Sequence, residues 1–296
     1  MSAGTPPHVR QSAAASPRAD RRVAAAAARV RIRVAGLDMR YPAPGGEVRA
    51  LDNVSFEIAE GEFVALLGPS GCGKSTILNI VAGLLDRTGG EVRLDGEEVR
   101  HGQVNRQVGY VFQRDTVFPW RTVEANIGYG LEIAGVAKAE RQAKVRRTIE
   151  AAGLAGFDKS FPRTLSGGMR QRVALMRTLI MEPEILLMDE PFGALDTHTK
   201  LEMHKTLLEI WERERQTVLF VTHDLGEALT LASRIILLSA RPGRVKEDVA
   251  VPFPRPRDAV ALRETAEFGR CYSHVWHSLG EEFRRAPAAA PAPEPR

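Results

Sequence analysis

Apolar residues of this chain gather in short runs that have the length and composition of buried strands, at Phe63–Leu67, Glu184–Asp189 and Thr217–Thr222. The runs end in polar groups or glycine, at Gly68, at the Asp189-Glu190 pair and at His223. Open α/β sheets bind their ligands at the carboxyl ends of the strands. The pattern therefore predicts an α/β fold whose functional site lies where these runs end.

Alternation of apolar and polar residues marks the antiparallel parts of the fold. Val30–Ile58 alternates with the strand period, and Gly45-Gly46 within it predicts a hairpin turn. Two more hairpins are expected around Asp95-Gly96 and around Arg241-Pro242-Gly243. Val108–Phe112 is a further expected strand, which ends at Gln113, and helices are expected at Ile77–Leu85, 138–152, Met169–Ile180 and 258–283. In the last helix, apolar residues at roughly helical spacing predict packing on the domain, namely Leu262, Phe268, Tyr272, Trp276, Leu279 and Phe283.

The segment after the first run fits the pattern G-x-x-x-x-G-K-[ST], from Gly68 to Ser75. Its glycines allow backbone conformations closed to other residues, so successive N–H groups can wrap an anion at the positive end of the next helix. Lys74 would supply charge for the β and γ phosphates of ATP, and the Ser75 hydroxyl a ligand for Mg²⁺. Cys72 lies beside Lys74 and ahead of the helix, which would favour its thiolate.

Three other features have both a structural and a functional interpretation. Ser166, ahead of Gly167-Gly168, would cap a helix, and the same turn would make a second anion site. Tyr41 would be a half-buried strand residue or an aromatic face for adenine. Trp120, in the apolar cluster Phe118-Pro119-Trp120, would fill the core or form a docking surface.

Length and composition indicate the class of protein. The chain has 296 residues, of which 44% are hydrophobic, enough for one large α/β domain or two small ones. Arg234 interrupts the run Ala228–Ala240, and no run reaches the roughly 18 to 20 residues of a membrane span, so we expect a soluble or peripheral chain. The two cysteines, Cys72 and Cys271, form no disulfide framework, and an ATP loop that contains a cysteine favours a reducing compartment.

The formal charge of +4 comes from the N-terminus. The first 33 residues hold seven arginines against Asp20, a balance of +6, so the remaining residues sum to −2. No nucleic-acid partner is therefore expected for the globular part. Residues 1–29 and 286–296, rich in Ala and Pro and in the first case Arg, predict disordered extensions, with an organellar transit peptide as the alternative for the first.

Residues 30–250 resemble the ATP-binding subunits of ABC transporters. The motifs that carry the resemblance are the Walker A loop Gly68–Thr76, the Q-loop Gln113, the signature Leu165–Met169, the Walker B strand Ile185–Glu190, the D-loop Gly193–Asp196 and the switch histidine His223. The resemblance implies an α/β P-loop NTPase core with a mainly parallel sheet, an N-terminal antiparallel β subdomain and a small helical subdomain at about residues 114–180. Residues 251–285 would form a short C-terminal helical segment.

The same resemblance implies a site for ATP and Mg²⁺. Glu190 would polarise the attacking water, and His223 and Gln113 would sense the γ-phosphate, which makes these the catalytic residues. Metal contacts would come from Ser75, Gln113 and Asp189. The nucleotide would be bound by Tyr41, Gly68, Pro69, Ser70, Gly71, Cys72, Gly73, Lys74, Ser75 and Thr76, and, from a second copy, by Ser166, Gly167, Gly168 and Asp196.

Within the family, the nitrate, sulfonate and taurine importers are the most similar, on the strength of Phe118-Pro119-Trp120, Met169, Met188–Gly193 and Ser239–Gly243. The implied partners are a second copy bound head to tail through ATP, transmembrane permease subunits and, indirectly, a solute-binding protein, at the cytoplasmic face of the inner membrane. Sulfonate, nitrate, taurine and a thiamine precursor stay open as solutes. A soluble ABC ATPase outside transport is the other alternative, although such proteins usually carry two cassettes or a long inserted arm. A switch without hydrolysis would lack Glu190 or His223.

Overall fold

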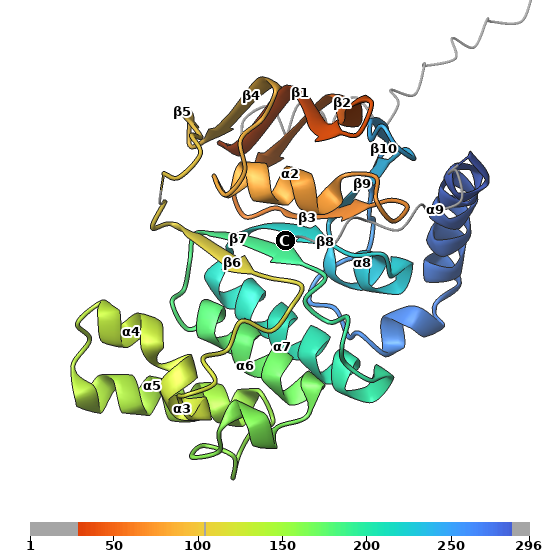
Figure 1. Cartoon of the computed structure of the whole chain (residues 1–296). Coiled ribbons are helices and arrows are strands. Elements are labelled where there is room, and N and C mark those ends of the chain that lie inside the picture. Colours follow the sequence, from red (N-terminus) through yellow and green to blue (C-terminus); the bar gives the residue numbers. More distant parts are fainter. Residues whose placement is uncertain (1–28, 104, 286–296) are drawn as a thin grey trace, which may run out of the picture.

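The structure is a computed structural model that describes residues 29–103 and 105–285. The extensions expected at residues 1–29 and 286–296 lie outside this part of the chain, apart from Arg29. Two sheets with one helix between them form the upper half of the molecule, and helices cover the free face of the larger sheet (Figure 1).

The larger sheet has six strands in the order β10-β9-β3-β8-β7-β6. Its central strands are the three apolar runs, and every residue in them is buried: β3 (Phe63–Leu67), β7 (Ile185–Asp189) and β8 (Thr217–Val221). The remaining strands are β6 (Val108–Val111), β9 (Arg234–Leu238) and β10 (Val245–Ala250), of which only β10 is antiparallel to its neighbour. Burial on both faces is what a parallel sheet between helices requires. The prediction of buried strands is confirmed.

The smaller sheet is antiparallel, with four strands in the order β2-β1-β4-β5. β1 (Val30–Ala43) and β2 (Gly46–Ala59) form a long hairpin, and β4 (Gly89–Leu94) and β5 (Glu97–Glu98) form a short one. In the short turn Asp95 and Gly96 have φ angles of 50° and 83°, the left-handed conformations that a type I′ turn requires. The hairpins predicted at Gly45-Gly46 and Asp95-Gly96 are confirmed, and β9 and β10 form the third, around Arg241-Pro242-Gly243.

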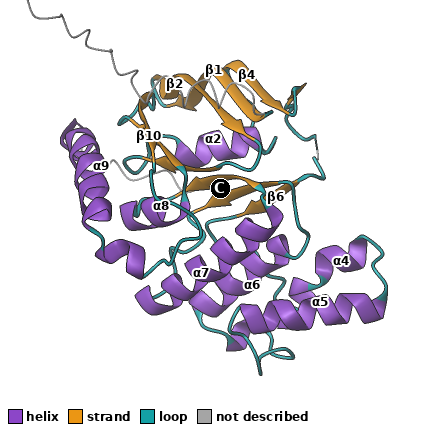
Figure 2. Ribbon diagram, turned by 180° about the vertical axis from the view of Figure 1, so that it is seen from behind, coloured by secondary structure: helices purple, strands orange, loops and turns teal. Residues whose placement is uncertain are grey.

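Helix α2 (Lys74–Val81) lies between the two sheets, as Figures 1 and 2 both show. On the other face of the larger sheet lie α6 (Gly167–Leu179) and α7 (Thr197–Glu214), with a separate group of helices beside them. That group consists of α3 (Val123–Ile127), α4 (Tyr129–Ile133) and α5 (Lys138–Ala151), followed by a 3-10 turn at Pro162–Thr164. Strand β3 divides the core: Phe63, Ala65 and Leu67 pack toward the α6 side, and Val64 and Leu66 toward α2.

The C-terminal part consists of α8 (Leu225–Leu231), a 3-10 turn at Ala261–Glu264 and α9 (Ala266–Arg285). The predicted terminal helix therefore exists, but it packs through Phe268, Val275 and Leu279, while Trp276 is 52% exposed. The apolar spacing correctly predicts a helix, but α9 begins at Ala266 and not at residue 258, and Tyr272 and Trp276 are exposed where packing was expected. In the described residues, no helix combines the length and the apolar character needed to cross a bilayer.

Candidate active site

The phosphate loop joins the buried strand β3 to helix α2. Gly71 and Gly73 adopt φ angles of 73° and 101°, in the left-handed region where a side chain would be strained. A Cβ on Gly73 would also lie 2.5 Å from a methyl carbon of Leu51, so this position accepts only glycine. The Lys74 ammonium folds back over the loop and donates to the carbonyl oxygens of Gly68 and Pro69, at 2.8 and 2.9 Å. The left-handed glycines and the lysine at the start of α2 fit a loop that wraps an anion.

A cavity of about 540 Å³ opens over this loop. One wall comes from the long hairpin and includes Tyr41, whose hydroxyl lies 3.1 Å from Oγ1 of Thr76. The rest of the lining comprises Pro42, Ala43, Pro44, Val48, Ala50, Ser70, Gly71, Gly73, Lys74, Ser75, Thr76, Gln113, Glu190 and Arg241. An apolar and aromatic wall beside a cationic loop fits a nucleotide, with the base toward Tyr41 and the phosphates toward Lys74.

Two of the residues expected to hold Mg²⁺ are in contact. The Ser75 hydroxyl donates to Oδ1 of Asp189 at 2.9 Å. Asp189 is buried, and this burial raises its pKa above the ordinary value, against the opposing effects of the Ser75 hydrogen bond and the nearby Lys74. A buried carboxylate beside a hydroxyl fits a hard divalent cation, which would restore the favourable charge balance. In the described chain no three His, Cys, Asp or Glu side chains gather as a metal site, so the phosphates and water would supply the remaining oxygens.

The three residues expected to be catalytic meet at one carboxylate oxygen. Oε2 of Glu190 accepts a hydrogen bond from Nε2 of Gln113 at 3.1 Å and lies 3.2 Å from Nδ1 of His223. Glu190 has a φ of 46°, which is uncommon for a residue with a side chain, and its N–H donates to Val221 at 2.9 Å. The end of β8 therefore helps to hold the Glu190 backbone in this conformation, at the edge of the cavity.

Gln171, which the motifs did not single out, braces the same region. Its side chain is 3% exposed on α6. Nε2 donates to the carbonyl oxygen of Glu190 at 3.3 Å, and Oε1 accepts from the N–H of Ala194 at 2.9 Å. A signal existed in the sequence, because Gln171 lies four residues before the buried Leu175 and so occupies the inward face of a predicted helix. A polar residue on that face needs buried partners.

A second unpredicted network surrounds His223. Glu227 is 3% exposed, accepts from the hydroxyl of Thr222 at 2.6 Å and pairs with Lys200 at 2.7 Å. Lys200 also lies 3.3 Å from Asp224, the residue that caps α8. The residues on both sides of His223 are thus tied to α7, the helix that follows the D-loop.

The signature and D-loop residues lie outside the cavity. Ser166 caps α6 by accepting from the N–H of Met169, and Asp196 caps α7 by accepting from the N–H of Thr199. A Cβ on Gly168 would lie 3.2 Å from Leu195, so the two helix N-termini are neighbours. Ser166 and Asp196 are both exposed. They form a separate polar surface that the nucleotide cavity of the same chain does not include.

The prediction of a thiolate at Cys72 is wrong. The side chain is fully buried in the core beneath the smaller sheet, and this burial raises the pKa of its thiol. The charges of Lys74 and Arg241 oppose that shift but do not reverse it. Cys72 therefore offers its backbone to the phosphate loop, while its neutral side chain is a packing group.

Trp120 does not fill the core. It is 71% exposed, and its loop is held by the fully buried Asn126. Oδ1 of Asn126 accepts from the N–H of Phe118 at 2.7 Å, and Nδ2 donates to carbonyl oxygens of the same loop, including that of Arg121 at 2.9 Å. Phe118 packs edge-on against Tyr129, with ring centroids 4.7 Å apart. The loop is well fixed, and it presents the indole to solvent.

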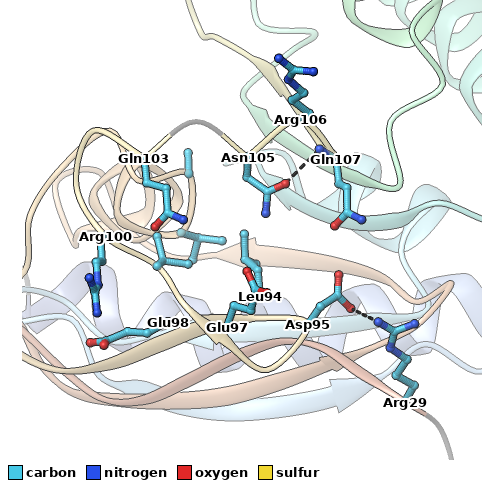
Figure 3. Close-up of a pocket in the computed structure, with 13 residues that line it drawn as sticks. Arg29, Leu94, Asp95, Glu97, Glu98, Arg100, Gln103, Asn105, Arg106 and Gln107 are labelled. Carbon is cyan, nitrogen blue, oxygen red and sulfur yellow. Dashed lines mark hydrogen bonds and ion pairs between the residues drawn. The ribbon is translucent and has the colours of Figure 1, made fainter.

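A second cavity, of about 480 Å³, lies between the short hairpin β4–β5 and the segment that leads into β6 (Figure 3). Charged side chains of both signs line this cavity, among them Arg29, Asp95, Glu98 and Arg100. Arg29 and Asp95 form an ion pair at 3.1 Å. None of the residues that the motifs single out lies on its wall. The chemistry of the chain is concentrated at the first cavity.

Sequence comparisons agree with this geometry. A profile of the ABC transporter family matches residues 51–193. An uncharacterized ABC transporter ATP-binding protein of Methanocaldococcus jannaschii is 48% identical over 79% of this chain and 87% of that protein. A putative ATP-binding protein of Brucella abortus is 46% identical over 81% and 90%, respectively. An aliphatic sulfonates import ATP-binding protein of Bacillus cereus is 42% identical over 74% and 86%.

Solved structures match the fold. A dimeric bacterial ABC transporter cassette has a TM-score of 0.69 and 34% identity, covering 75% of this chain and all of that one. A dimeric ATP-binding cassette in a post-hydrolysis state, bound to ADP and Pi, has a TM-score of 0.68 and 32% identity over the same shares. The predicted α/β fold with a P-loop NTPase core is confirmed by this likeness together with the strand order.

Proposed function

The chain belongs to the ABC transporter family of ATP-binding proteins and is an ATPase, and we propose that it powers the import of a small anionic or zwitterionic solute. Sulfonates are the solute class we favour, with nitrate and taurine next. The support is the 42% identity to the aliphatic sulfonates import protein of Bacillus cereus and the motif variants around Trp120 and Arg241. Import of a thiamine precursor would use the same ATPase with a different permease and solute-binding protein.

The observation that carries the proposal is the shared oxygen of Glu190, which Gln113 and His223 both approach at the edge of the phosphate cavity. A carboxylate in that place can accept a proton or a hydrogen bond from a water that attacks the γ-phosphate. Gln113 and His223 would orient this carboxylate and respond to a phosphate bound in the cavity. The chemistry then needs positioning and charge stabilisation and no covalent intermediate.

Phosphate binding would fall to the backbone of the loop Gly68–Thr76 and to Lys74. Ser75 and Asp189, with Gln113, would hold Mg²⁺, which neutralises charge on the β and γ oxygens when it is bound. In the present arrangement Lys74 donates to two carbonyl oxygens of its own loop. Binding of the triphosphate would replace these two carbonyl contacts of Lys74 by contacts with phosphate oxygens. The lysine side chain would need to move little, because both carbonyl groups belong to the loop that wraps the phosphates.

A second copy would complete the site. Ser166 and Asp196 are exposed, Gly167 and Gly168 are half-buried, and all four lie outside the cavity of their own chain. The two similar cassettes were solved as dimers. We infer a head-to-tail dimer, in which the capped N-terminus of α6 in one copy faces the nucleotide held by the other copy.

Permease subunits are the further partner, at the cytoplasmic face of the inner membrane. The exposed Trp120 follows Gln113 in the chain, so a partner bound there would be linked to the phosphate sensor by a short segment. Aromatic side chains fixed on the surface are typical of interface hot spots. A solute-binding protein would act on the permease and not on this chain.

The proposal is tested by uptake. Cells that lack the gene should lose uptake of one labelled solute among an alkanesulfonate, nitrate and taurine, and only the wild-type gene should restore it. A Glu190→Gln gene should express and fail to restore uptake, which ties transport to hydrolysis. If uptake of all three solutes is unaffected while the purified protein hydrolyses ATP, the assignment to an importer of these solutes is wrong and the ATPase assignment stands.

A further inference from the structure

The turn between β9 and β10 lies against the phosphate loop, although nothing in the motifs links the two. Gly243 forms a bridge with Leu51, and its N–H donates to Ala50 at 2.8 Å. A Cβ on Gly243 would collide with the carbonyl oxygen of Cys72, so the turn and the loop are in direct contact. This contact places the side chain of Arg241 over the tip of the loop.

Arg241 reaches the nucleotide cavity from that turn. Its Nε donates to the carbonyl oxygen of Gly71 at 3.2 Å, and the residue lines the cavity together with Lys74 and Glu190. In the part of the chain that the structure describes, the terminal nitrogens of Arg241 donate to no protein group. The side chain is exposed. A guanidinium held at one nitrogen therefore has four N–H groups left for a ligand in the cavity.

Helix α9 holds the turn from its other side. Glu282, which is 3% exposed, accepts from the N–H of Ala240 at 2.9 Å and pairs with Lys246 at 2.9 Å. Lys246 also donates to the carbonyl oxygen of Ser278 at 2.8 Å. The turn is thus fixed between α9 and the phosphate loop, which limits where the Arg241 side chain can go.

The neighbouring Arg244 is also an arginine, but it does not reach the nucleotide cavity. Its position, and not its residue type, separates it from Arg241. Arg244 donates through Nε to Asp52 at 2.6 Å and lies outside the cavity wall. Asp52 has a second cation, Arg49, at 2.5 Å. Arg244 is therefore paired with the carboxylate of Asp52, and Asp52 would still be paired with Arg49 if Arg244 were removed.

We propose that Arg241 is a second phosphate-binding cation of the ATP site, whose terminal nitrogens donate to phosphate oxygens while its Nε stays on Gly71. This rests on the proposed function, since it needs ATP in the cavity. A guanidinium matches phosphate in geometry, and its hydrogen bonds to a charged acceptor are stronger than those between neutral groups. Lys74 would bind the phosphates from within the loop, and Arg241 from above its tip.

The test is binding of Mg-ATP by titration calorimetry to the full chain, with the catalytic Glu190→Gln change present in every protein so that ATP is not consumed. Arg241→Ala should weaken binding by about tenfold or more, as expected for loss of charge-assisted hydrogen bonds. Arg241→Lys should lose less, because it keeps the charge. Arg241→Gln keeps a donor for the Gly71 carbonyl oxygen but has no charge. It should therefore bind ATP as weakly as the alanine variant does. Arg244→Ala is the matched control and should bind as the parent does.

Other outcomes overturn the proposal. If Arg241→Gln restores binding, the residue only supports the Gly71 carbonyl. If binding is unchanged in Arg241→Ala while the same change in the otherwise wild-type chain lowers ATPase activity, the side chain acts on the second copy and not on the nucleotide. If the parent protein itself binds no ATP, the proposed function fails and the role of Arg241 fails with it. Thermal unfolding of each variant verifies that the compared proteins are folded.

Discussion

Nδ1 of His223 lies 3.2 Å from Oε2 of Glu190, so the side chains that follow two adjacent parallel strands are in contact. Glu190 follows β7, and His223 follows β8 by two residues. The contact joins the group expected to polarise water to a group expected to sense the γ-phosphate. A change in either one should alter hydrolysis more than binding.

The first prediction follows from that contact. Glu190→Gln should keep ATP binding and lower turnover by about 10²–10⁴-fold, because the amide cannot accept a proton from water. The protein should then accumulate as an ATP-bound dimer, measurable by size-exclusion chromatography with light scattering. Lys74→Ala is the comparison variant, and it should weaken nucleotide binding itself. Near-normal ATPase activity of Glu190→Gln would show that the base is another group.

The second prediction concerns Cys72, whose burial raises the pKa of the thiol. In a Cys271→Ala background, N-ethylmaleimide should label native Cys72 more than about tenfold more slowly than the unfolded chain, because both thiolate fraction and access are reduced. Peptide mass spectrometry over time measures the two rates. Rapid labelling of the native protein at neutral pH would mean that the phosphate loop opens readily in solution.

The third prediction is a pH dependence of stability that comes from His204. This side chain is fully buried against Phe192, and its burial, together with Arg263 and Lys200, lowers its pKa to about 3 from the ordinary 6.5, with Asp224 opposing. The unfolded chain therefore binds the extra proton between these two pH values, and the folded state loses stability as pH falls through that window.

His204→Leu removes the titration. Between pH 6.5 and about 5.5, the free energy of unfolding of the wild type should fall by about 1 kcal/mol relative to this variant. Urea denaturation at both pH values measures the difference. Parallel behaviour of the two proteins would mean that His204 is protonated in the folded state, with a counter-charge that the present contacts do not include.

The sequence was sufficient for features that depend on local order. The loop at Gly68–Thr76 needs a strand before it and a helix after it, and both can be recognised within a few residues. The turn at Asp95-Gly96 and the cap at Ser166 are also local, since each depends on one or two residue types. The glycine loop, the turn and the cap lie where the sequence predicts them, whereas the helix after the loop spans Lys74–Val81 and not the expected Ile77–Leu85.

The rest depends on which distant segments meet, and that cannot be derived from spacing. The pair of Lys200 with Glu227, and the contact of Arg241 with Gly71, join residues far apart in the chain. Cys72 was misjudged for the same reason, because its helix and its lysine neighbour are local while its burial comes from the smaller sheet.

The last prediction separates core from interface at two tryptophans. Trp120 is 71% exposed and Trp211 is 3% exposed, with its indole N–H donating to Gln216 at 2.8 Å. Trp211→Ala would remove a buried ring and should cost roughly 3–5 kcal/mol of stability, seen as a lower melting temperature of the isolated chain. Trp120→Ala removes an exposed ring, so the melting temperature and basal ATPase rate should stay close to those of the wild type.

Co-purification with the permease then decides what Trp120 does. An exposed aromatic side chain on a loop fixed by Asn126 is pre-organised, so its removal should lower recovery of the complex and transport together. Phe118 offers an internal check, since it packs on Tyr129 and its loss should disturb the loop as well as the partner. A Trp120→Ala protein that assembles and transports normally would move the docking surface elsewhere on the molecule. A Trp120→Ala protein that melts early would instead mean that the loop folds back over the indole in solution.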